Sequence, residues 1–257
     1  MKKIIYLFLV VALLSLSSCL TIDNWDAPDC QFYGKVIDSY TGEPLLASQN
    51  DWQIRIWETS FPDSVTNYQT IPIKQDGTYN DSRLFAGIYD LLPYDGPFWP
   101  VDTMKNIELK SSTEQNFTVT PYLQLVDFKT EMRSNGLYMS CKLKAPLKEK
   151  NGQALPNLVR VQAFVSHTVF CGNGTNSSIS MVEFSTSPNI ARIDINRSWA
   201  AEMTANDMDP NSELSKEYTL GPLPVKSGYT YYVRMGANLN VLSQRFNYSQ
   251  IEKIVVP

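Results

Sequence analysis

Histidine is nearly missing from this chain, with one residue, His167, among 257. Histidine titrates close to neutral pH and is a frequent partner of catalytic nucleophiles and of zinc. His167 also lies inside a strand-like stretch from Val161 to Val169, so we expect it to have a structural role. This scarcity argues against a histidine-based triad and against a histidine metal centre.

The short signatures of several enzyme classes are missing as well. No GxSxG, HExxH or GxxxxGK[ST] arrangement occurs, so nothing points to a serine hydrolase, a zinc peptidase or a P-loop nucleotide site. A pair of carboxylates would suffice for glycoside hydrolysis and leaves no such signature. We predict no catalytic residues and no cofactor, because small sandwich domains usually display binding loops rather than a deep cleft.

One acidic stretch has the spacing of a calcium loop but lacks its other requirements. The oxygen-bearing side chains alternate along it as Asp207, Asp209, Asn211 and Glu213. An EF-hand needs glycine at its sixth position and glutamate at its twelfth, where this chain has Ser212 and Tyr218. We therefore predict a solvated acidic loop and no metal site, with a calcium loop of a different kind as the alternative.

The chain has little excess charge of either sign. Lysine and arginine number 22 against 26 aspartate and glutamate, which gives a net charge of −4, and no basic cluster stands out. Proteins that bind nucleic acids neutralise phosphates with clustered lysine and arginine. We predict no nucleic-acid partner.

No apolar run is long enough to cross a bilayer. Two lysines precede an apolar stretch from Ile4 to Leu14, which supplies roughly half of the about 20 residues that a membrane-spanning helix needs. The sequence Leu-Ser-Ser-Cys at residues 16–19 follows and resembles the bacterial lipobox. Residues 1–18 are thus predicted to be a signal peptide, whose removal leaves Cys19 with diacylglycerol on its sulfur. The alternative is a plain secreted protein cut near Ser18.

Residues 19–30 are predicted to be a lipidated tether, because they are polar and interrupted by a proline. Each buried methylene contributes about 0.8 kcal/mol, so two or three acyl chains on Cys19 would hold the protein on a membrane. Leu20 gives no sign of inner-membrane retention, and Asp23 and Asp26 resemble the acidic signal of surface-exported lipoproteins. We expect an outer-membrane location, with the cell surface favoured and the periplasmic face left open.

Aromatic residues are abundant, whereas helix-forming stretches are scarce. Aromatics make up 12% of the chain, with 14 tyrosines and 5 tryptophans, and such residues favour strands. Strand-like stretches separated by glycine and proline turns run along the chain, and Pro121 marks a boundary between them. We predict an all-β protein of two consecutive β-sandwich domains, residues 31–120 and 121–257.

The alternation of apolar and polar residues places the individual elements. Strands are expected in the first domain at Phe32–Asp38 and Gln53–Glu58, with another one starting in Leu84–Tyr89. In the second domain we expect strands near residues 122–128, 137–143, 159–165, 180–184 and 191–195. One short helix is expected at residues 198–208, with Ser198 as its N-cap.

Three ordered motifs in the first domain resemble a known fold. They are Gly34 and Asp38 with Thr41-Gly42-Glu43-Pro44, then Asp76-Gly77-Thr78-Tyr79, then Phe85-Ala86-Gly87-Ile88-Tyr89. They are similar to the carboxypeptidase-regulatory-like, transthyretin-type sandwich. With the motifs at residues 24–28 and 96–98, the whole chain resembles the Bacteroidetes lipoprotein family called domain of unknown function 3823.

The late part of the second domain resembles a different sandwich. The stretch from Leu220 to Arg234 is similar to the late strands of fibronectin-type and immunoglobulin-like domains. In those domains a tyrosine at a corner forms a hydrogen bond back to the upstream backbone. The resemblance implies a fibronectin-like or immunoglobulin-like second domain.

Three cysteines remain beside the lipidated one: Cys30, Cys141 and Cys171. An odd number in an exported protein allows one pair, and two of them lie in strand-like stretches of the second domain. One prediction is therefore a disulfide between Cys141 and Cys171. The other is three buried thiols, because free cysteine packs as a small hydrophobe.

The segment at residues 93–100 is the main candidate for ligand binding. Its sequence, Pro-Tyr-Asp-Gly-Pro-Phe-Trp-Pro, predicts a rigid loop. Flat rings match the C–H faces of sugars and a carboxylate accepts hydrogen bonds from their hydroxyls. The candidate residues are Tyr94, Asp95, Phe98 and Trp99 in the loop, with Trp199 and Tyr231 from the second domain. The alternative is that the rings fold back to plug their own sandwich or to seat the neighbouring domain.

The family resemblance implies a role in glycan uptake, in which a lipoprotein with serial sandwich domains holds polysaccharide near an outer-membrane transporter complex. The alternative is a structural or assembly lipoprotein that contacts other envelope proteins and binds no glycan. These two readings differ in whether aromatic side chains lie exposed on one face or buried between the domains. The expected partners are thus the membrane, polysaccharide and the transporter.

Replacing the lipidated residue tests the anchor. We expect Cys19→Ala to leave the folded body intact and to release the protein from membranes, because all anchoring is assigned to acyl chains on that sulfur. Sedimentation of membranes followed by immunodetection measures the bound fraction. A variant that still sediments with membranes would show that the lipobox prediction is wrong.

Overall fold

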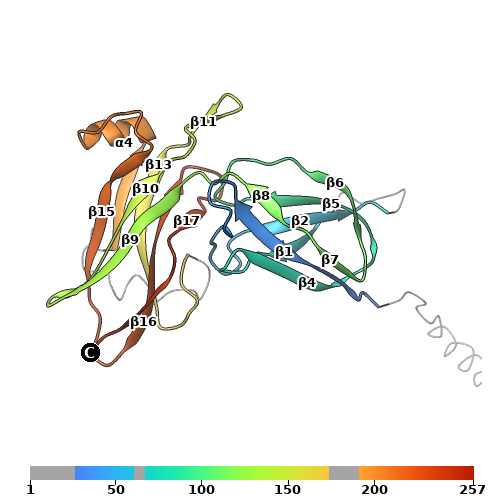
Figure 1. Ribbon diagram of the computed structural model, residues 1–257, viewed down its shortest axis with the longest axis horizontal. Helices are drawn as coiled ribbons and strands as arrows, with labels where there is room; N and C mark the ends of the chain where they lie inside the picture. The colour runs from blue at the N-terminus through green and yellow to red at the C-terminus, as the bar shows by residue number, and fades with distance from the viewer. Residues whose placement is uncertain (1–26, 61–66, 174–190) are drawn as a thin grey trace, which may run out of the picture.

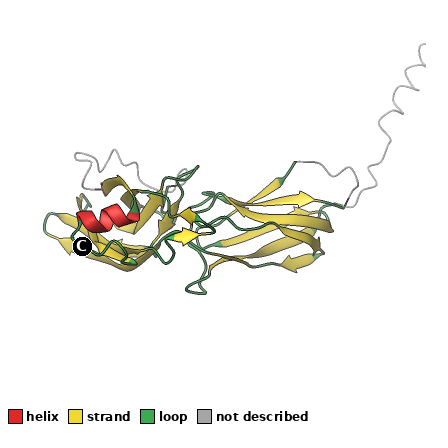
Figure 2. Cartoon of the chain, turned by 90° about the horizontal axis from the view of Figure 1, so that it is seen from above, coloured by secondary structure: helices red, strands yellow, loops and turns green. Residues whose placement is uncertain are grey.

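The computed structural model describes residues 27–60, 67–173 and 191–257 of the chain (Figure 1). The predicted signal peptide (1–18), Cys19, most of the tether and the strand expected near residues 180–184 lie outside the described residues. Two β-sandwich domains follow one another along the long axis of the molecule (Figures 1 and 2). In the described part of the chain, no helix has the length and apolarity to cross a membrane.

The first domain consists of two facing sheets. One contains β4 (Thr78–Leu84), β1 (Cys30–Asp38), β7 (Ser112–Glu114) and β8 (Phe117–Val119). The other has the order β3 (Gln69–Pro72), β2 (Gln53–Glu58), β5 (Gly87–Tyr94) and β6 (Met104–Leu109). Alternate side chains of β1 and β2 enter the core between the sheets, as Phe32, Ile54 and Ile56 do. The strands predicted near residues 32–38 and 53–58 are confirmed.

Two glycines of the family motifs lie where a side chain cannot fit. A Cβ on Gly34 would lie 1.9 Å from the carbonyl oxygen of Gln115, because the chain crosses β1 closely there. Gly77 has φ of +77°, and a Cβ there would lie 2.6 Å from the carbonyl oxygen of Leu45. The strand predicted to start in Leu84–Tyr89 is confirmed as β5, which begins at Gly87, whereas β4 ends at Leu84 in the opposite sheet.

The second domain is also a sandwich. Its smaller sheet has the order β15 (Leu214–Leu223), β10 (Gly136–Lys144) and β9 (Gln124–Arg133). The facing sheet contains β14 (Arg192–Arg197), β13 (Leu158–Ser166), β16 (Thr230–Leu239), β17 (Phe246–Tyr248) and β18 (Glu252–Val255). A hairpin of β11 (Glu149–Lys150) and β12 (Gln153–Ala154) projects beside them (Figure 1).

Local signals placed two further features of this domain correctly. The helix α4 (Trp199–Ala205) begins after Ser198, whose hydroxyl accepts a hydrogen bond from the Ala201 N–H at 3.3 Å. The hydroxyl of Tyr231 accepts a hydrogen bond from the backbone N–H of Lys226, five residues upstream, at 3.1 Å. The helix is confirmed, and the second contact has the form of a tyrosine corner.

The cysteines form no disulfide in the described structure, so the predicted bond between Cys141 and Cys171 is wrong. Cys141 lies on β10 and points into the core between the two sheets of the second domain. Cys171 instead packs with Phe164 and Tyr248 in a separate cluster on the other side of the β13–β16 sheet. The sheet therefore keeps the two sulfurs apart, and Cys30 is buried in the first domain.

Burial should make these thiols unreactive. Desolvation raises the pKa of Cys141 and of Cys171 to about 12, so the folded state keeps both protonated. At pH 8 only about one in 10,000 of each would be thiolate, against a substantial fraction in the unfolded chain. We expect iodoacetamide at pH 8 to leave both unmodified in the native protein and to alkylate them in urea, as measured by intact mass. A native protein lighter by the mass of two hydrogen atoms would instead show that the disulfide forms.

Candidate functional site

The predicted aromatic loop is a plug and not an exposed platform. Phe98 and Trp99 are 4% and 2% exposed. Phe98 packs edge-on against Trp52, and the ring of Trp99 lies 5.2 Å from that of Tyr122, the second residue after the domain boundary. The backbone N–H of Trp99 also donates to Thr120 at 2.9 Å. The prediction that Phe98 and Trp99 are exposed is wrong, because packing the two domains against each other covers them.

Trp199 and Tyr231 do not contribute an exposed surface either. Both are 3% exposed and belong to the core of the second domain. The indole Nε1–H of Trp199 donates to the carbonyl of Ser212 at 2.7 Å, which fixes α4 on the loop before β15. Tyr231 is held by its corner hydrogen bond. The prediction that Trp199 and Tyr231 contact sugar is therefore wrong, because both side chains are buried.

Asp95 joins the two domains through an ion pair. Arg245 of the second domain reaches Asp95 at 3.1 Å and Asp51 at 3.3 Å, and both acids belong to the first domain. Asp51 is almost fully buried, and desolvation raises its pKa while Arg245 and Arg234 act in the opposite direction. Asp95 is thus committed to the domain junction.

A fully buried arginine lies at the centre of this junction. Arg234 is 0% exposed, and its guanidinium carbon lies 3.6 Å from the centre of the Tyr248 ring. Its Nη2 donates across the junction to the carbonyl of Ala47 at 2.8 Å. Burial lowers the pKa of Arg234, and the buried carboxylate of Asp51 opposes that shift. The junction therefore contains a desolvated cation stabilised from both domains.

Two side-chain amides connect the domains further through hydrogen bonds to backbone groups. The side chain of Gln75 donates to the carbonyl of Val169 and accepts from the N–H of Cys171, each at 2.8 Å. Asn247 donates to the carbonyl of Pro97 at 3.0 Å and accepts from the N–H of Leu123 at 3.3 Å. These amides hold the two domains in one arrangement.

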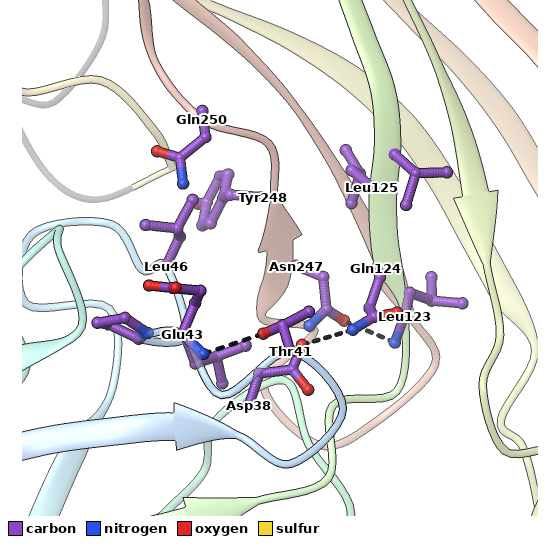
Figure 3. A pocket seen from close by; sticks show the side chains of 13 residues that line it. Asp38, Thr41, Glu43, Leu46, Leu123, Gln124, Leu125, Asn247, Tyr248 and Gln250 are labelled. Carbon is purple, nitrogen blue, oxygen red and sulfur yellow. Dashed lines mark hydrogen bonds between the residues drawn. The ribbon is translucent and has the colours of Figure 1, made fainter.

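A groove of about 230 Å³ opens beside the junction (Figure 3). It lies between the loop after β1 and the start of β9, and Tyr248 and Gln250 form another wall. The Asp38 carboxylate already accepts hydrogen bonds from Gln124 at 2.6 Å and from the Tyr40 N–H at 2.8 Å. Ligand pockets usually enclose about 300 to 1,000 Å³. The groove is a poor candidate for a large ligand, because its volume is small and the Asp38 carboxylate already has hydrogen-bond partners.

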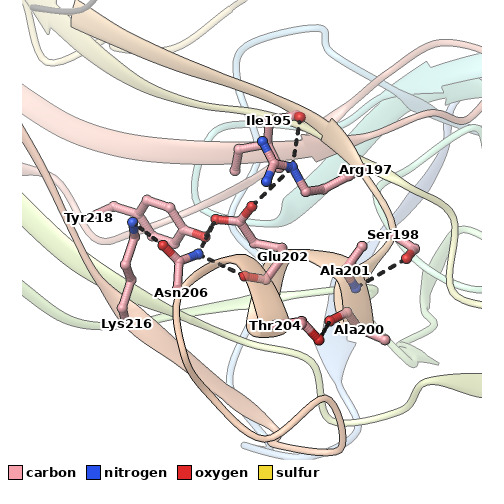
Figure 4. A network of polar contacts seen from close by, with 10 residues as sticks. All are labelled: Ile195, Arg197, Ser198, Ala200, Ala201, Glu202, Thr204, Asn206, Lys216 and Tyr218. Atoms are coloured by element: carbon pink, nitrogen blue, oxygen red, sulfur yellow. Dashed lines mark hydrogen bonds and ion pairs between the residues drawn. The ribbon is translucent and has the colours of Figure 1, made fainter.

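The second domain contains a buried carboxylate that is also engaged (Figure 4). Glu202, 5% exposed, accepts hydrogen bonds from Tyr218 at 2.7 Å and Asn206 at 2.8 Å, and pairs with Arg197 at 3.4 Å. Burial and the neighbouring carboxylate raise the pKa of Tyr218. These contacts fasten α4 to β14 and β15, so Glu202 has a structural role.

The acidic loop after α4 has ordinary turn geometry. The Asp209 carboxylate accepts a hydrogen bond from the Asn211 N–H at 2.8 Å. Among the residues that the structure describes, no three histidine, cysteine, aspartate or glutamate side chains come together as metal ligands.

Aromatic side chains that are exposed or half-buried gather on the outer face of the β3-β2-β5-β6 sheet, away from the core. The guanidinium of Arg55 lies between two tyrosine rings, 3.3 Å from the centre of Tyr94 and 4.1 Å from that of Tyr68. The ring of Trp57 packs edge-on against the ring of Tyr68, with 5.7 Å between the ring centres. We call Arg55, Trp57, Tyr68 and Tyr94 the aromatic face. Tyr68 is 43% exposed and the other three are half-buried.

The strand register assembles the aromatic face from distant parts of the chain. Gln53 pairs with Tyr94 across β2 and β5, and Arg55 pairs with Thr70 across β2 and β3, so Arg55 lies diagonally between the two tyrosines. Of the predicted ligand residues, Tyr94 alone is on this face. Arg55 and Trp57 alternate with buried isoleucines along β2, and this alternation indicated that they face outward. No local sequence pattern linked them to Tyr68.

Two family models match nearly all of the described chain. Residues 30–120 match the N-terminal domain of the protein family of unknown function DUF3823, and residues 123–253 match the domain of unknown function DUF3823_C. The chain belongs to the DUF3823 family. This confirms the predicted family and its all-β, two-sandwich architecture.

Solved structures of similar fold come from Bacteroides and Parabacteroides species. A "putative carbohydrate binding protein" from Bacteroides uniformis is 24% identical with a TM-score of 0.70, over 89% of this chain and 100% of the other. A DUF3823 family protein from the same species is 22% identical with a TM-score of 0.66, over 90% and 100%. One from Parabacteroides merdae is 20% identical with a TM-score of 0.60, over 89% and 100%. A search of curated proteins gives no match.

Truncating the plug tests its structural role. We expect Trp99→Ala to lower the free energy of unfolding by about 3 to 5 kcal/mol, because it opens a large cavity at the domain junction. Trp57→Ala is the matched control, since it removes the same side chain from the half-buried aromatic face and should cost well under half as much. Urea denaturation followed by circular dichroism measures both. Equal costs would contradict the assignment of Trp99 to the core.

Proposed function

We propose that this protein is an outer-membrane lipoprotein, anchored through Cys19, that binds carbohydrate on its aromatic face as an accessory of a glycan-uptake system. One observation carries the proposal: two tyrosines, one tryptophan and one arginine share a solvent-facing sheet surface. The similar Bacteroides uniformis structure named for carbohydrate binding supports it. The expected setting is the cell surface, beside polysaccharide and a transporter complex.

The chemistry of the face suits sugars. Aromatic rings pack against pyranose C–H groups, while guanidinium N–H groups donate to hydroxyl oxygens. Tyr68 is 43% exposed and Tyr94 is half-buried, so part of each side chain can meet a ligand. Arg55 holds the two rings at fixed positions, which lowers the conformational entropy lost on binding.

A second function has support from the same residues. Tryptophan, tyrosine and arginine are the residues most enriched at the energetic centres of protein interfaces. A structural or assembly lipoprotein would use the aromatic face to contact another envelope protein and would bind no glycan.

Binding by matched variants separates the two functions. The folded body would be screened on a glycan array, and titration calorimetry would follow each hit. We expect Trp57→Ala and Tyr94→Ala each to weaken glycan binding by about tenfold or more, which is about 1.4 kcal/mol, without a large change in melting temperature. Tyr229→Ala, which removes a 51% exposed ring from the second domain, is the control and should bind normally.

Other outcomes have defined meanings. Wild-type-like binding by both face variants would remove the aromatic face as the site. If no glycan binds while an envelope protein is captured and lost with Trp57→Ala, the assembly function replaces the proposed one.

A further inference from the structure

The first domain has a distinct end where the chain enters from the tether. Cys30, the first residue of β1, pairs with Leu84, and Gly87 pairs with Leu109 at the same end of the opposite sheet. The turn between β6 and β7 also lies there, because the Gln31 N–H donates to Ser111 at 3.0 Å. Figure 1 shows this tether end at the opposite side of the first domain from the second domain.

The turn that connects β4 in one sheet to β5 in the other presents apolar side chains to solvent at the tether end. Phe85 is 43% exposed and Ile88 is 40% exposed, and Ala86 between them is exposed as well. Large apolar residues exposed singly are ordinary on protein surfaces, but two beside one turn form a local patch.

The backbone beneath this patch is held firmly. The hydroxyl of Tyr89 donates to the Phe85 carbonyl at 3.0 Å. The Ile88 carbonyl accepts from the Thr59 N–H at 2.7 Å, and the Ile88 N–H donates to Ser60 Oγ at 2.8 Å. These contacts keep the apolar tip pointing outward instead of letting it fold onto the core.

The length of the tether places this end near a membrane. Residues 20–29 separate Cys19 from Cys30, and a fully extended chain of that length spans at most about 33 to 36 Å. Acyl chains on Cys19 would therefore keep the tether end within that distance of the lipid. Such a tether limits distance but not orientation, so any preferred orientation must come from the folded surface.

We propose that the tether end rests on the lipid surface, with Phe85 and Ile88 inserted among the headgroups and the second domain pointing away from the membrane. This inference rests on the anchoring at Cys19 in the proposed function, but not on glycan binding. Aromatic and aliphatic side chains at a lipid interface gain from apolar burial.

The surrounding charges indicate an apolar contact and not an electrostatic one. Acidic Asp29, Glu58 and Glu108 offset basic Arg83 and Lys110 at this end. Attraction to anionic lipid requires a basic excess near the surface. The contact should therefore form on zwitterionic vesicles and persist in salt.

A polarity-sensitive dye in the turn between β4 and β5 tests the contact. The lipidated full chain with Ala86→Cys would be labelled with a nitrobenzoxadiazole dye and reconstituted in phosphatidylcholine vesicles, with the chain lacking this substitution as the background for slow labelling of buried thiols. We expect blue-shifted emission, roughly twofold stronger than that of the unanchored Cys19→Ala form, as for a dye moved from water to a lipid interface. Leu242→Cys, at a residue 90% exposed in the second domain, is the control and should keep a water-like spectrum.

A second variant separates contact from mere proximity. Phe85→Ser with Ile88→Ser, added to the labelled chain, should abolish the blue shift while the protein still sediments with vesicles. A water-like dye at residue 86 on sedimented wild-type-like protein would overturn this inference alone. If the lipidated chain fails to sediment, the anchoring in the proposed function fails and the inference with it.

Discussion

The buried guanidinium of Arg234 is the constraint on which the arrangement of the two domains depends. A desolvated cation is tolerated only where aromatic, carbonyl and carboxylate groups replace its lost water. In this chain the Tyr248 ring comes from the second domain, whereas the Ala47 carbonyl comes from the first. Moving the domains apart would leave the cation with the Tyr248 ring but without the Ala47 carbonyl. The side chains around it are therefore fixed in place.

This constraint divides the aromatic residues of the first domain into two groups. Phe98 and Trp99 lie toward the junction and are covered by it. Trp57, Tyr68 and Tyr94 lie on the outer face of the β3-β2-β5-β6 sheet, where Tyr68 is exposed and the other two are half-buried. Tyr94 and Phe98 are four residues apart, yet the turn between them, where Asp95 has a positive φ of 64°, sends them to different surfaces.

The sequence predicted what depends on local patterns. Strict alternation identified Gln53–Glu58 as a half-buried strand, and a serine before an amphipathic stretch identified the start of α4. Exposure at residues 93–100 could not be predicted, because it depends on how a second domain packs. The aromatic face likewise needed strand register, which brings Tyr68 and Tyr94 to the same arginine, and the cysteine pairing needed knowledge of which side of a sheet each sulfur occupies.

The crossing between the domains is itself a small piece of β-structure, since Phe98 and Pro121 form an antiparallel bridge. The backbone of Tyr122 also donates to Pro97 at 3.1 Å, so the connecting segment has no free length in which to bend. Within the described residues, the molecule therefore has no point at its middle where it can bend. A body of this kind keeps the far end of the second domain at a constant distance from the start of β1.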